Sequence, residues 1–275
     1  MNMHPLLKRT LARWKPQRDF LPNDACLTQA PSPQATIDLI DGWITAFPES
    51  TGIKTGGYAK LFEDARVAWG LGQCGGARDA SILELGPLEG AHTYLLDRAG
   101  AKSIVAIEGL KRSYLKCLIT KEVLGIHSAN FLLGNFIPWL ENDRRKFDLV
   151  WASGVLYHMT EPTHLLRLIA ARTGKVFLWT HYYPDDFAPA PPYRAPLAGV
   201  RDVEFNGRLI RHFDRSYMGA MDTAAFCGGV YSGASWLRRG DILAVLADLG
   251  LSRIEIAFDQ PDAETPSFAV VATRG

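Results

Sequence analysis

SILELGPLEG, residues 81–90, is the stretch of sequence that decides the fold. Its first five residues form a short apolar run, which is typical of a strand buried in a sheet. Gly86, Pro87 and Gly90 follow, and a helical pattern over residues 91–99 begins directly after them. Glycine lets a backbone turn sharply and approach a ligand, and a helix start offers free N–H groups and a positive dipole end. The segment therefore predicts a strand–turn–helix unit that can hold a ligand, with a plain structural turn as the alternative.

The alternation of apolar runs and helical patterns continues along the chain. Further strands are expected at residues 103–107, 131–133, 147–152 and 176–180, and helices at 110–124 and 162–172. A helix at 241–249, ended by Gly250, and strands at 252–258 and 267–272 complete the pattern. Near-continuous apolar strands separated by helices indicate a parallel sheet that is covered on both faces. We predict an α/β, doubly wound (Rossmann-like), seven-stranded and mainly parallel sheet, closed by an antiparallel hairpin.

An N-terminal helical extension is predicted over residues 1–79, ahead of a domain that spans residues 80–275. Its first 18 residues are basic and amphipathic, which allows contact with RNA or an anionic membrane as well as packing on the domain. Helices are expected at residues 35–46 and 59–71 from the spacing of their apolar side chains.

A long insertion rich in proline, glycine and aromatic residues follows the fifth strand, over residues 182–235. Within it, Asn206 and Gly207 separate two short alternating runs, which predicts a hairpin with a type I′ turn. An insertion of this length at this position predicts a lid that helps to bind the acceptor.

Composition narrows the function classes. The chain has 275 residues, 30 Lys and Arg against 29 Asp and Glu, and a net charge of +1. A dedicated nucleic-acid binder usually shows a stronger basic excess. The four cysteines are scattered, which argues against a zinc site or a disulfide framework. No apolar run is long enough to span a membrane and no secretory signal is recognisable, so we expect a cytoplasmic protein of undetermined oligomeric state.

An acid at the end of the second strand points to an adenosine-containing ligand. Glu108 lies 22 residues after Gly86, where a carboxylate can accept hydrogen bonds from both hydroxyls of a ribose. Asn135 and Phe136 follow the third strand, where an amide can bind the adenine amino group and a ring can cover its face. Asn135 as an ordinary turn residue is the alternative. The turn after the first strand is not G-x-G-x-x-G, which disfavours a nicotinamide-dependent oxidoreductase.

The fourth strand and the residues after it carry a family resemblance. FDLVWASGVLYHMTEP, residues 147–162, resembles the same region of class I S-adenosylmethionine-dependent methyltransferases, and residues 81–90 resemble the first motif of that superfamily. The pattern is nearest to the branch that contains the tRNA wobble-uridine carboxymethyltransferases, where a strand is also followed by G-V-L-Y-H. The resemblance covers residues 80–181 and, more loosely, 235–273.

This resemblance implies S-adenosyl-L-methionine as the cofactor and assigns roles to residues. The implied cofactor-binding residues are Glu84, Gly86, Pro87 and Gly90 for the methionine part, Glu108 and Gly109 for the ribose, and Asn135 and Phe136 for the adenine. Ser153, Gly154, Tyr157 and His158 are implied to face the sulfonium and the acceptor. One departure is Leu88, which replaces the usual central glycine of the turn.

Methyl transfer depends mainly on positioning, which can supply about 7–11 kcal/mol, and a general base can add about 10²–10⁴-fold. The candidate catalytic residues are His158, His181 and Tyr157, with packing or loop anchoring as the alternative for each. Asp185 and Asp186 do not complete a ligand set, so no metal is expected. The expected acceptor is an O or N atom of a small molecule or glycan. A tRNA-modifying (carboxy)methyltransferase and a non-catalytic methyltransferase-like module are the alternatives.

Overall fold

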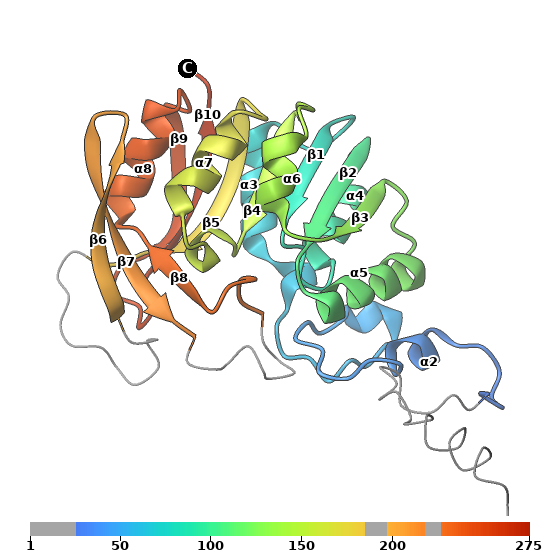
Figure 1. Ribbon diagram of the computed structural model, residues 1–275. Coiled ribbons are helices and arrows are strands. Elements are labelled where there is room, and N and C mark those ends of the chain that lie inside the picture. Colours follow the sequence, from blue (N-terminus) through green and yellow to red (C-terminus); the bar gives the residue numbers. More distant parts are fainter. Residues whose placement is uncertain (1–25, 185–196, 218–226) are drawn as a thin grey trace, which may run out of the picture.

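The computed structural model describes residues 26–184, 197–217 and 227–275 (Figure 1). The basic helix predicted in the first 18 residues, and the Asp185–Asp186 pair, lie outside these residues. Within them, no helix is long and apolar enough to cross a membrane.

A seven-stranded sheet forms the centre of the molecule, in the order β3-β2-β1-β4-β5-β10-β9. Its strands are β1 (Ser81–Leu85), β2 (Ser103–Glu108), β3 (Ala129–Leu133), β4 (Leu149–Ser153), β5 (Lys175–His181), β9 (Arg253–Gln260) and β10 (Ser267–Thr273). The first five strands are parallel, and β10 runs antiparallel to both of its neighbours, β5 and β9. The predicted doubly wound, mainly parallel α/β sheet is confirmed.

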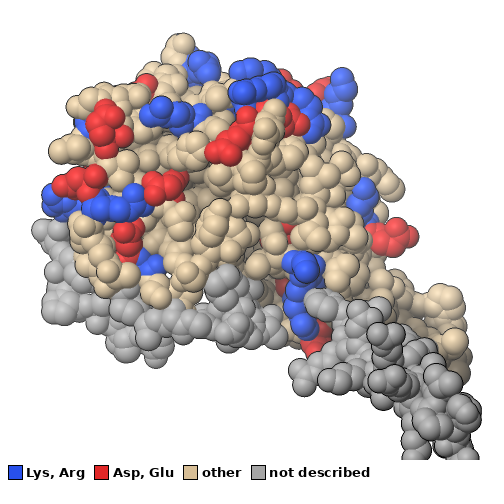
Figure 2. Space-filling view, viewed as in Figure 1, with Lys and Arg blue, Asp and Glu red and all other residues tan. Residues whose placement is uncertain are grey.

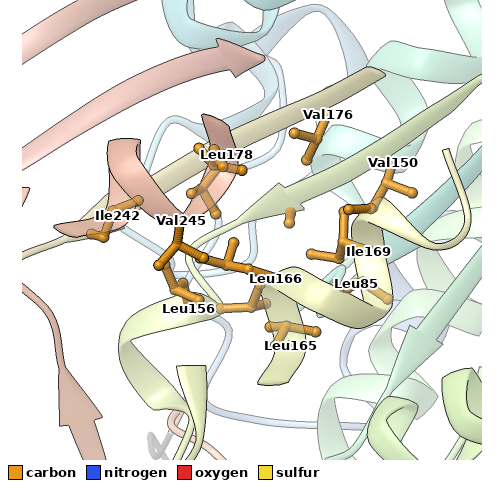
Figure 3. Packing of buried hydrophobic residues seen from close by; sticks show 14 of the residues in the cluster. Leu85, Val150, Leu156, Leu165, Leu166, Ile169, Val176, Leu178, Ile242 and Val245 are labelled. Atoms are coloured by element: carbon orange, nitrogen blue, oxygen red, sulfur yellow. The ribbon is translucent and has the colours of Figure 1, made fainter. Parts of the chain in front are cut away.

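Helices cover both faces of this sheet because its strands are apolar on both sides. One face carries α3 (Ala65–Cys74), α4 (Ala91–Arg98) and α5 (Lys111–Leu124). The other carries α6 (Phe136–Asn142), α7 (Pro162–Ala170) and α8 (Arg239–Asp248). Figure 3 shows the second core, where Leu165 and Ile169 of α7 and Val245 of α8 pack against the side chains of β4 and β5.

A second, three-stranded sheet consists of β6 (Leu197–Phe205), β7 (Arg208–Ser216) and β8 (Gly233–Trp236). Asn206 and Gly207 between β6 and β7 have φ values of 50° and 81°, so the predicted type I′ hairpin is confirmed. Strand β8 packs against the short 3₁₀ helix that follows β4, η3 (Leu156–His158). The Trp236 indole N–H donates to the Tyr157 carbonyl at 3.0 Å, which attaches the smaller sheet to the end of β4.

The helix predicted at residues 35–46 is wrong, because only α2 (Pro33–Ile37) is helical there. Gly42 has a φ of 66°, and the chain beyond it is extended. The N–H groups of Ile44 and Thr45, which a helix would direct to its own carbonyls, instead donate to the carboxylate of Glu89. A tertiary contact has therefore replaced local helix hydrogen bonds.

The helix predicted at residues 59–71 begins later than expected. A 3₁₀ turn, η2 (Leu61–Glu63), comes first, and α3 starts after Asp64. The Asp64 side chain accepts the N–H of Arg66 at 2.9 Å, which is an N-cap that fixes the helix start. The helix α6 was not predicted from the sequence, and Asn135 caps it in the same way.

Candidate active site

A cavity of about 380 Å³ opens at the carboxyl ends of β1, β2 and β4. Its volume lies in the range of small-molecule sites, and its position is where open α/β sheets bind ligands. The wall combines the turns after these strands with two other parts of the chain. Those parts are the N-terminal segment, through Ile44, Tyr58, Ala59, Leu61 and Arg66, and the stretch before β8, at residues 227–231.

The turn after β1 has a backbone that few sequences can adopt. Gly86 has a φ of 63°, and a Cβ at this position would lie 2.6 Å from Cγ1 of Val155. Leu88 also has a positive φ, 57°, so this leucine takes the left-handed conformation that favours glycine. Its N–H donates to Oε2 of Glu108 at 3.0 Å. The departure noted at Leu88 is thus accommodated by the backbone, and the turn keeps its contact with β2.

Two carboxylates, Glu84 and Glu108, are buried in the wall of the cavity, with 2% and 6% of their surface exposed. Burial raises the pKa of Glu84 to about 8, against the lowering effect of a hydrogen bond from the Thr93 hydroxyl at 2.5 Å. Burial raises the pKa of Glu108 to about 7, although its carboxylate accepts the N–H groups of Leu88 and Leu110. Neither carboxylate has a salt bridge to a described residue, so both suit a ligand with positive charge and hydroxyl groups.

The stretch at residues 227–231 lines the cavity and packs both on His158, where a Cβ on Gly229 would lie 2.5 Å from the carbonyl oxygen, and on the residues after β2 and β3. A Cβ on Gly109 would lie 2.7 Å from Cγ1 of Val230, and the Asn135 amide nitrogen is 3.3 Å from the Tyr231 hydroxyl. Phe136, the next cavity residue, is 8% exposed. This stretch therefore packs directly on the residues expected to surround an adenine.

His158 and Tyr157, which follow β4, also line the cavity. The Nδ1 atom of His158 lies 2.6 Å from the hydroxyl of Tyr217, which also accepts the N–H of Gly229 at 3.3 Å. Burial lowers the pKa of His158 to about 4, so its ring is neutral at physiological pH. Burial also raises the pKa of the Tyr157 phenol far above its ordinary value, so that side chain stays protonated.

His181 does not line the cavity, although it is close to it. Its ring packs against Tyr157 and Trp179, with centroid distances of 4.6 and 4.9 Å, and stacks on Trp236 at 5.6 Å. Its Nδ1 lies 3.3 Å from the Pro266 carbonyl. Burial is the main cause that lowers the pKa of His181. The structure therefore separates the two candidate histidines: His158 faces the cavity and His181 supports the aromatic wall.

A hydrogen-bonded chain that the sequence did not reveal also reaches the cavity. Arg66 donates to Asp64 from Nε at 2.9 Å and from Nη2 at 2.6 Å, and His92 Nε2 lies 2.9 Å from Asp64. The Trp151 indole N–H donates to His92 Nδ1 at 3.3 Å. An indole N–H is only a donor, so His92 carries its proton on Nε2 and donates it to Asp64. Burial would raise the pKa of Asp64, but the bonds from His92 and Arg66 outweigh it and hold that pKa well below its usual range.

Most of the residues predicted for the site line this one cavity: Glu84, Gly86, Pro87, Glu108, Gly109, Asn135, Phe136, Ser153, Gly154, Tyr157 and His158. Gly90 lies outside the lining and begins α4 with a φ of 84°. Within the part of the chain that the structure describes, no group of three or more His, Cys, Asp or Glu side chains is placed to hold a metal ion.

Comparison with known proteins shows which proteins share this architecture. No family model matches the chain. The chain is similar to the N-terminal domain of EvdMO1, solved in the presence of SAH and D-fucose, with a TM-score of 0.67 and 25% identity over 88% of this chain and 95% of that domain. This chain is a member of the class I S-adenosylmethionine-dependent methyltransferase superfamily.

Two further comparisons show how much of two longer proteins this chain matches. A similarity to the full EvdMO1 chain, at 24% identity and a TM-score of 0.59, covers 46% of that protein. The tRNA U34 carboxymethyltransferase of Cellvibrio japonicus (strain Ueda107) is 33% identical over 92 residues, which is 33% of this chain and 29% of that enzyme. This chain therefore spans about half of EvdMO1, and its match to the tRNA enzyme spans less than a third of it.

The cofactor of this superfamily member is S-adenosylmethionine, and the cavity fits it. This cofactor carries an ammonium, a carboxylate and a sulfonium charge, and two ribose hydroxyls. The buried carboxylates of Glu84 and Glu108, which have no described cationic partner, are acceptors for its ammonium and hydroxyl groups. Among the described residues that line the cavity there is no lysine, and the turn after β1 is not a glycine-rich phosphate loop, which agrees with a cofactor that has no phosphate.

Proposed function

We propose that this methyltransferase moves the methyl group of S-adenosylmethionine to a hydroxyl oxygen of a small-molecule or glycan acceptor. The proposal rests on the part of the cavity lined by Tyr157, His158 and Trp179. There, aromatic side chains lie beside the neutral imidazole of His158. Aromatic faces suit the ring of a sugar or another small molecule, and the neutral imidazole suits a hydroxyl group. The structural neighbour solved in the presence of D-fucose supports a sugar hydroxyl as the acceptor group.

In this proposal the roles follow the position of each residue along the cavity. Glu84 and the turn at Gly86 and Pro87 hold the methionine part, and Glu108 accepts the ribose hydroxyls. Asn135 and Phe136 border the adenine. The insertion predicted at residues 182–235 serves as part of the acceptor site, since residues 227–231 line the cavity.

When bound, the cofactor supplies a methyl group that is already activated, so the chain mainly has to position the acceptor. His158 would accept the proton of the acceptor hydroxyl at Nε2, and this role requires the tautomer in which Nδ1 carries the ring proton and faces the Tyr217 hydroxyl, 2.6 Å away. Because the pKa of His158 is about 4, the ring is neutral but weakly basic. Orientation by the ring and by the aromatic wall therefore contributes more than proton removal.

The test is isothermal titration of the protein with S-adenosylmethionine and S-adenosylhomocysteine, repeated on Glu108→Ala. We expect micromolar binding by the wild type and a loss of at least tenfold in the variant, because the variant lacks the carboxylate for the ribose. Glu255→Ala, an exposed glutamate on β9, is the matched control and should bind normally. A folded wild-type protein that binds neither ligand would refute the proposal.

A tRNA-modifying (carboxy)methyltransferase is the second candidate, favoured by the 92-residue likeness to the tRNA U34 enzyme. On the face shown in Figure 2, Lys and Arg side chains alternate with Asp and Glu and form no broad basic surface. Transfer of labelled methyl to bulk tRNA, with a steep fall in affinity as salt rises, would favour this candidate over the small-molecule acceptor.

A further inference from the structure

The guanidinium of Arg66 lies at the acceptor end of the cavity and belongs to no motif used above. Its Cζ lies 4.1 Å from the centroid of the Trp179 ring, and both side chains line the cavity. The Arg66 side chain is 20% exposed. A cation is therefore built into the cavity wall beside the aromatic ring of Trp179.

Arg66 is held rigidly, yet only part of its hydrogen-bonding capacity is used. Nε and one N–H of Nη2 bond to Asp64, which is itself fixed by the bond to His92. A guanidinium has five N–H donors. Among the described residues, the two donors of Nη1 and the second donor of Nη2 have no hydrogen-bond partner. These donors are pre-oriented in a fork, which is the geometry that binds a carboxylate or phosphate.

The ion pair with Asp64 already balances the charge of Arg66, so the attraction for a further anion comes from the unused N–H donors. The carboxylates of Glu84 and Glu108 lie at the turns after β1 and β2, where the cofactor binds in the proposed function. A bound cofactor would add a sulfonium charge to this cavity, and an acidic group on the acceptor would offset that positive charge.

We propose that the acceptor is an acidic hydroxylated ring compound, such as a sugar acid or sugar phosphate, whose oxyanion binds the donors of Arg66 while its ring packs on Trp179. This inference rests on the proposed function and narrows its acceptor to one chemical class. Arg66 acts in it as a specificity residue that holds the acceptor beside His158.

The test compares three sugars that have the same ring configuration and differ in charge. The methyl glycosides of D-fucose, D-galacturonate and D-galactose 6-phosphate differ only at carbon 6, which is a methyl group in the first, a carboxylate in the second and a phosphorylated CH2–O group in the third. Their binding to the protein loaded with S-adenosylhomocysteine is measured by titration calorimetry for wild type, Arg66→Gln and Arg66→Lys. Arg253→Gln, an exposed arginine of β9, is the matched control.

We expect the wild type to bind at least one acidic sugar about tenfold more tightly than the D-fucoside, as a charge-assisted bidentate contact requires. Arg66→Gln should abolish this preference while the affinity for the D-fucoside changes less than twofold. Arg66→Lys should restore part of it, because lysine keeps the charge without the fork. The better of the two acids identifies whether a carboxylate or a phosphate is bound.

The proposal is overturned if wild type binds the three sugars equally, binds none of them, or keeps its preference in Arg66→Gln. It is also overturned if Arg66→Gln weakens the binding of S-adenosylhomocysteine or of a carboxylated S-adenosylmethionine, because the oxyanion would then belong to the cofactor. Normal binding of S-adenosylhomocysteine in these experiments separates failure of the acceptor class from failure of the proposed function.

Discussion

Glu84 and Glu108 are the residues at which burial and charge are most clearly in conflict. They lie near the carboxyl ends of β1 and β2, and burial raises their pKa values to about 8 and about 7 from an ordinary value of 4.5. The fold therefore favours the protonated form of each carboxyl, whereas a cationic ligand favours the ionised form. The unliganded protein is for this reason sensitive to pH at its ligand site.

We expect the free energy of unfolding of the ligand-free protein to fall as pH rises from about 4.5 to about 8. The folded pKa lies above the unfolded pKa, so the stabilisation is complete below 4.5 and is lost as pH passes through the folded value. The loss is at most about 1.4 kcal/mol per pH unit for each carboxyl. Urea unfolding at pH 5, 6, 7 and 8 measures it. Glu84→Gln should flatten the slope, whereas an unchanged slope in this variant would show that Glu84 is not the source.

His158→Gln should lower the rate of methyl transfer by about 10²-fold or more, because the variant loses both the proton acceptor and the ring that orients the acceptor hydroxyl. Binding of S-adenosylhomocysteine should stay within twofold of wild type. With the pKa of His158 at about 4, protonation of this ring should reduce the wild-type rate only below about pH 5. Single-turnover rates across pH measure both effects, and a variant as fast as wild type would remove His158 from the mechanism.

The sequence predicted the residues that belong to contiguous motifs and missed those joined only by the fold. The motif residues come from the turns after β1 to β4, which a parallel sheet brings to one edge, so their meeting in the cavity followed from strand order. Asp64, Arg66, His92 and Trp151 come from a loop, two helices and a strand, with no spacing that relates them. Only the docking of α3 beside β5 brings Arg66 over Trp179.

At the scale of elements, the N-terminal segment is joined to the turn after β1 through a buried ion pair. The Glu89 carboxylate accepts the N–H groups of Ile44 and Thr45 and pairs with Lys116 of α5 at 2.7 Å. Glu89 and Lys116 have side-chain exposures of 1% and 4%. The ammonium nitrogen of Lys116 lies 5.2 Å from the centroid of the Trp43 ring. The Glu89 carboxylate therefore binds this segment at its centre, in addition to the donation of Lys116 to the Gly42 carbonyl and the packing of Trp43 and Phe47.

Glu89→Gln should destabilise the protein by about 3–5 kcal/mol, since it leaves the buried Lys116 ammonium without a carboxylate to balance its charge. Urea unfolding measures this cost. The double variant Glu89→Gln with Lys116→Met should recover a large part of it. Both variants should also increase amide hydrogen exchange at residues 43–47. Exchange that is unchanged there would mean that the hydrophobic contacts of Trp43 and Phe47 hold the segment without Glu89.

The elements themselves were predictable to the extent that local pattern and tertiary contact agree. The strands of the main sheet are apolar runs, and their order follows from the alternation of strand and helix. The hairpin at Asn206 and Gly207 follows from a local turn rule. Residues 35–46 show the opposite case, because Glu89 takes N–H groups that a helix would use. A carboxylate 44 residues further along the chain leaves no trace in the local pattern.

For the molecule as a whole, the cavity joins parts of the chain from Ile44 to Tyr231. In Figure 1 the N-terminal segment and the smaller sheet approach the same end of the main sheet from two sides. A ligand that contacts all of these parts should make their unfolding more cooperative. A ligand that contacts only the turn after β1 should not.

S-adenosylhomocysteine at 100 times its dissociation constant should raise the free energy of unfolding by about 2.7 kcal/mol and the Tm by roughly 5–10 °C. Calorimetry with and without the ligand measures both. Amide exchange should slow at residues 44–61 and 227–231 as well as in the turn after β1. Slower exchange confined to residues 84–90 and 108–109 would contradict the view that the flanking parts close on the ligand.

The antiparallel strand β10 has a consequence for how the protein is made. It lies between β5 and β9, although both are synthesised before it. Until residues 267–273 leave the ribosome, β5 presents an unpaired edge with the apolar side chains of Val176, Phe177 and Leu178 around it. Such an edge is prone to pair with other chains. The growing polypeptide therefore has an exposed β5 edge until β10 is synthesised. A chaperone that shields β5 during this time would reduce aggregation.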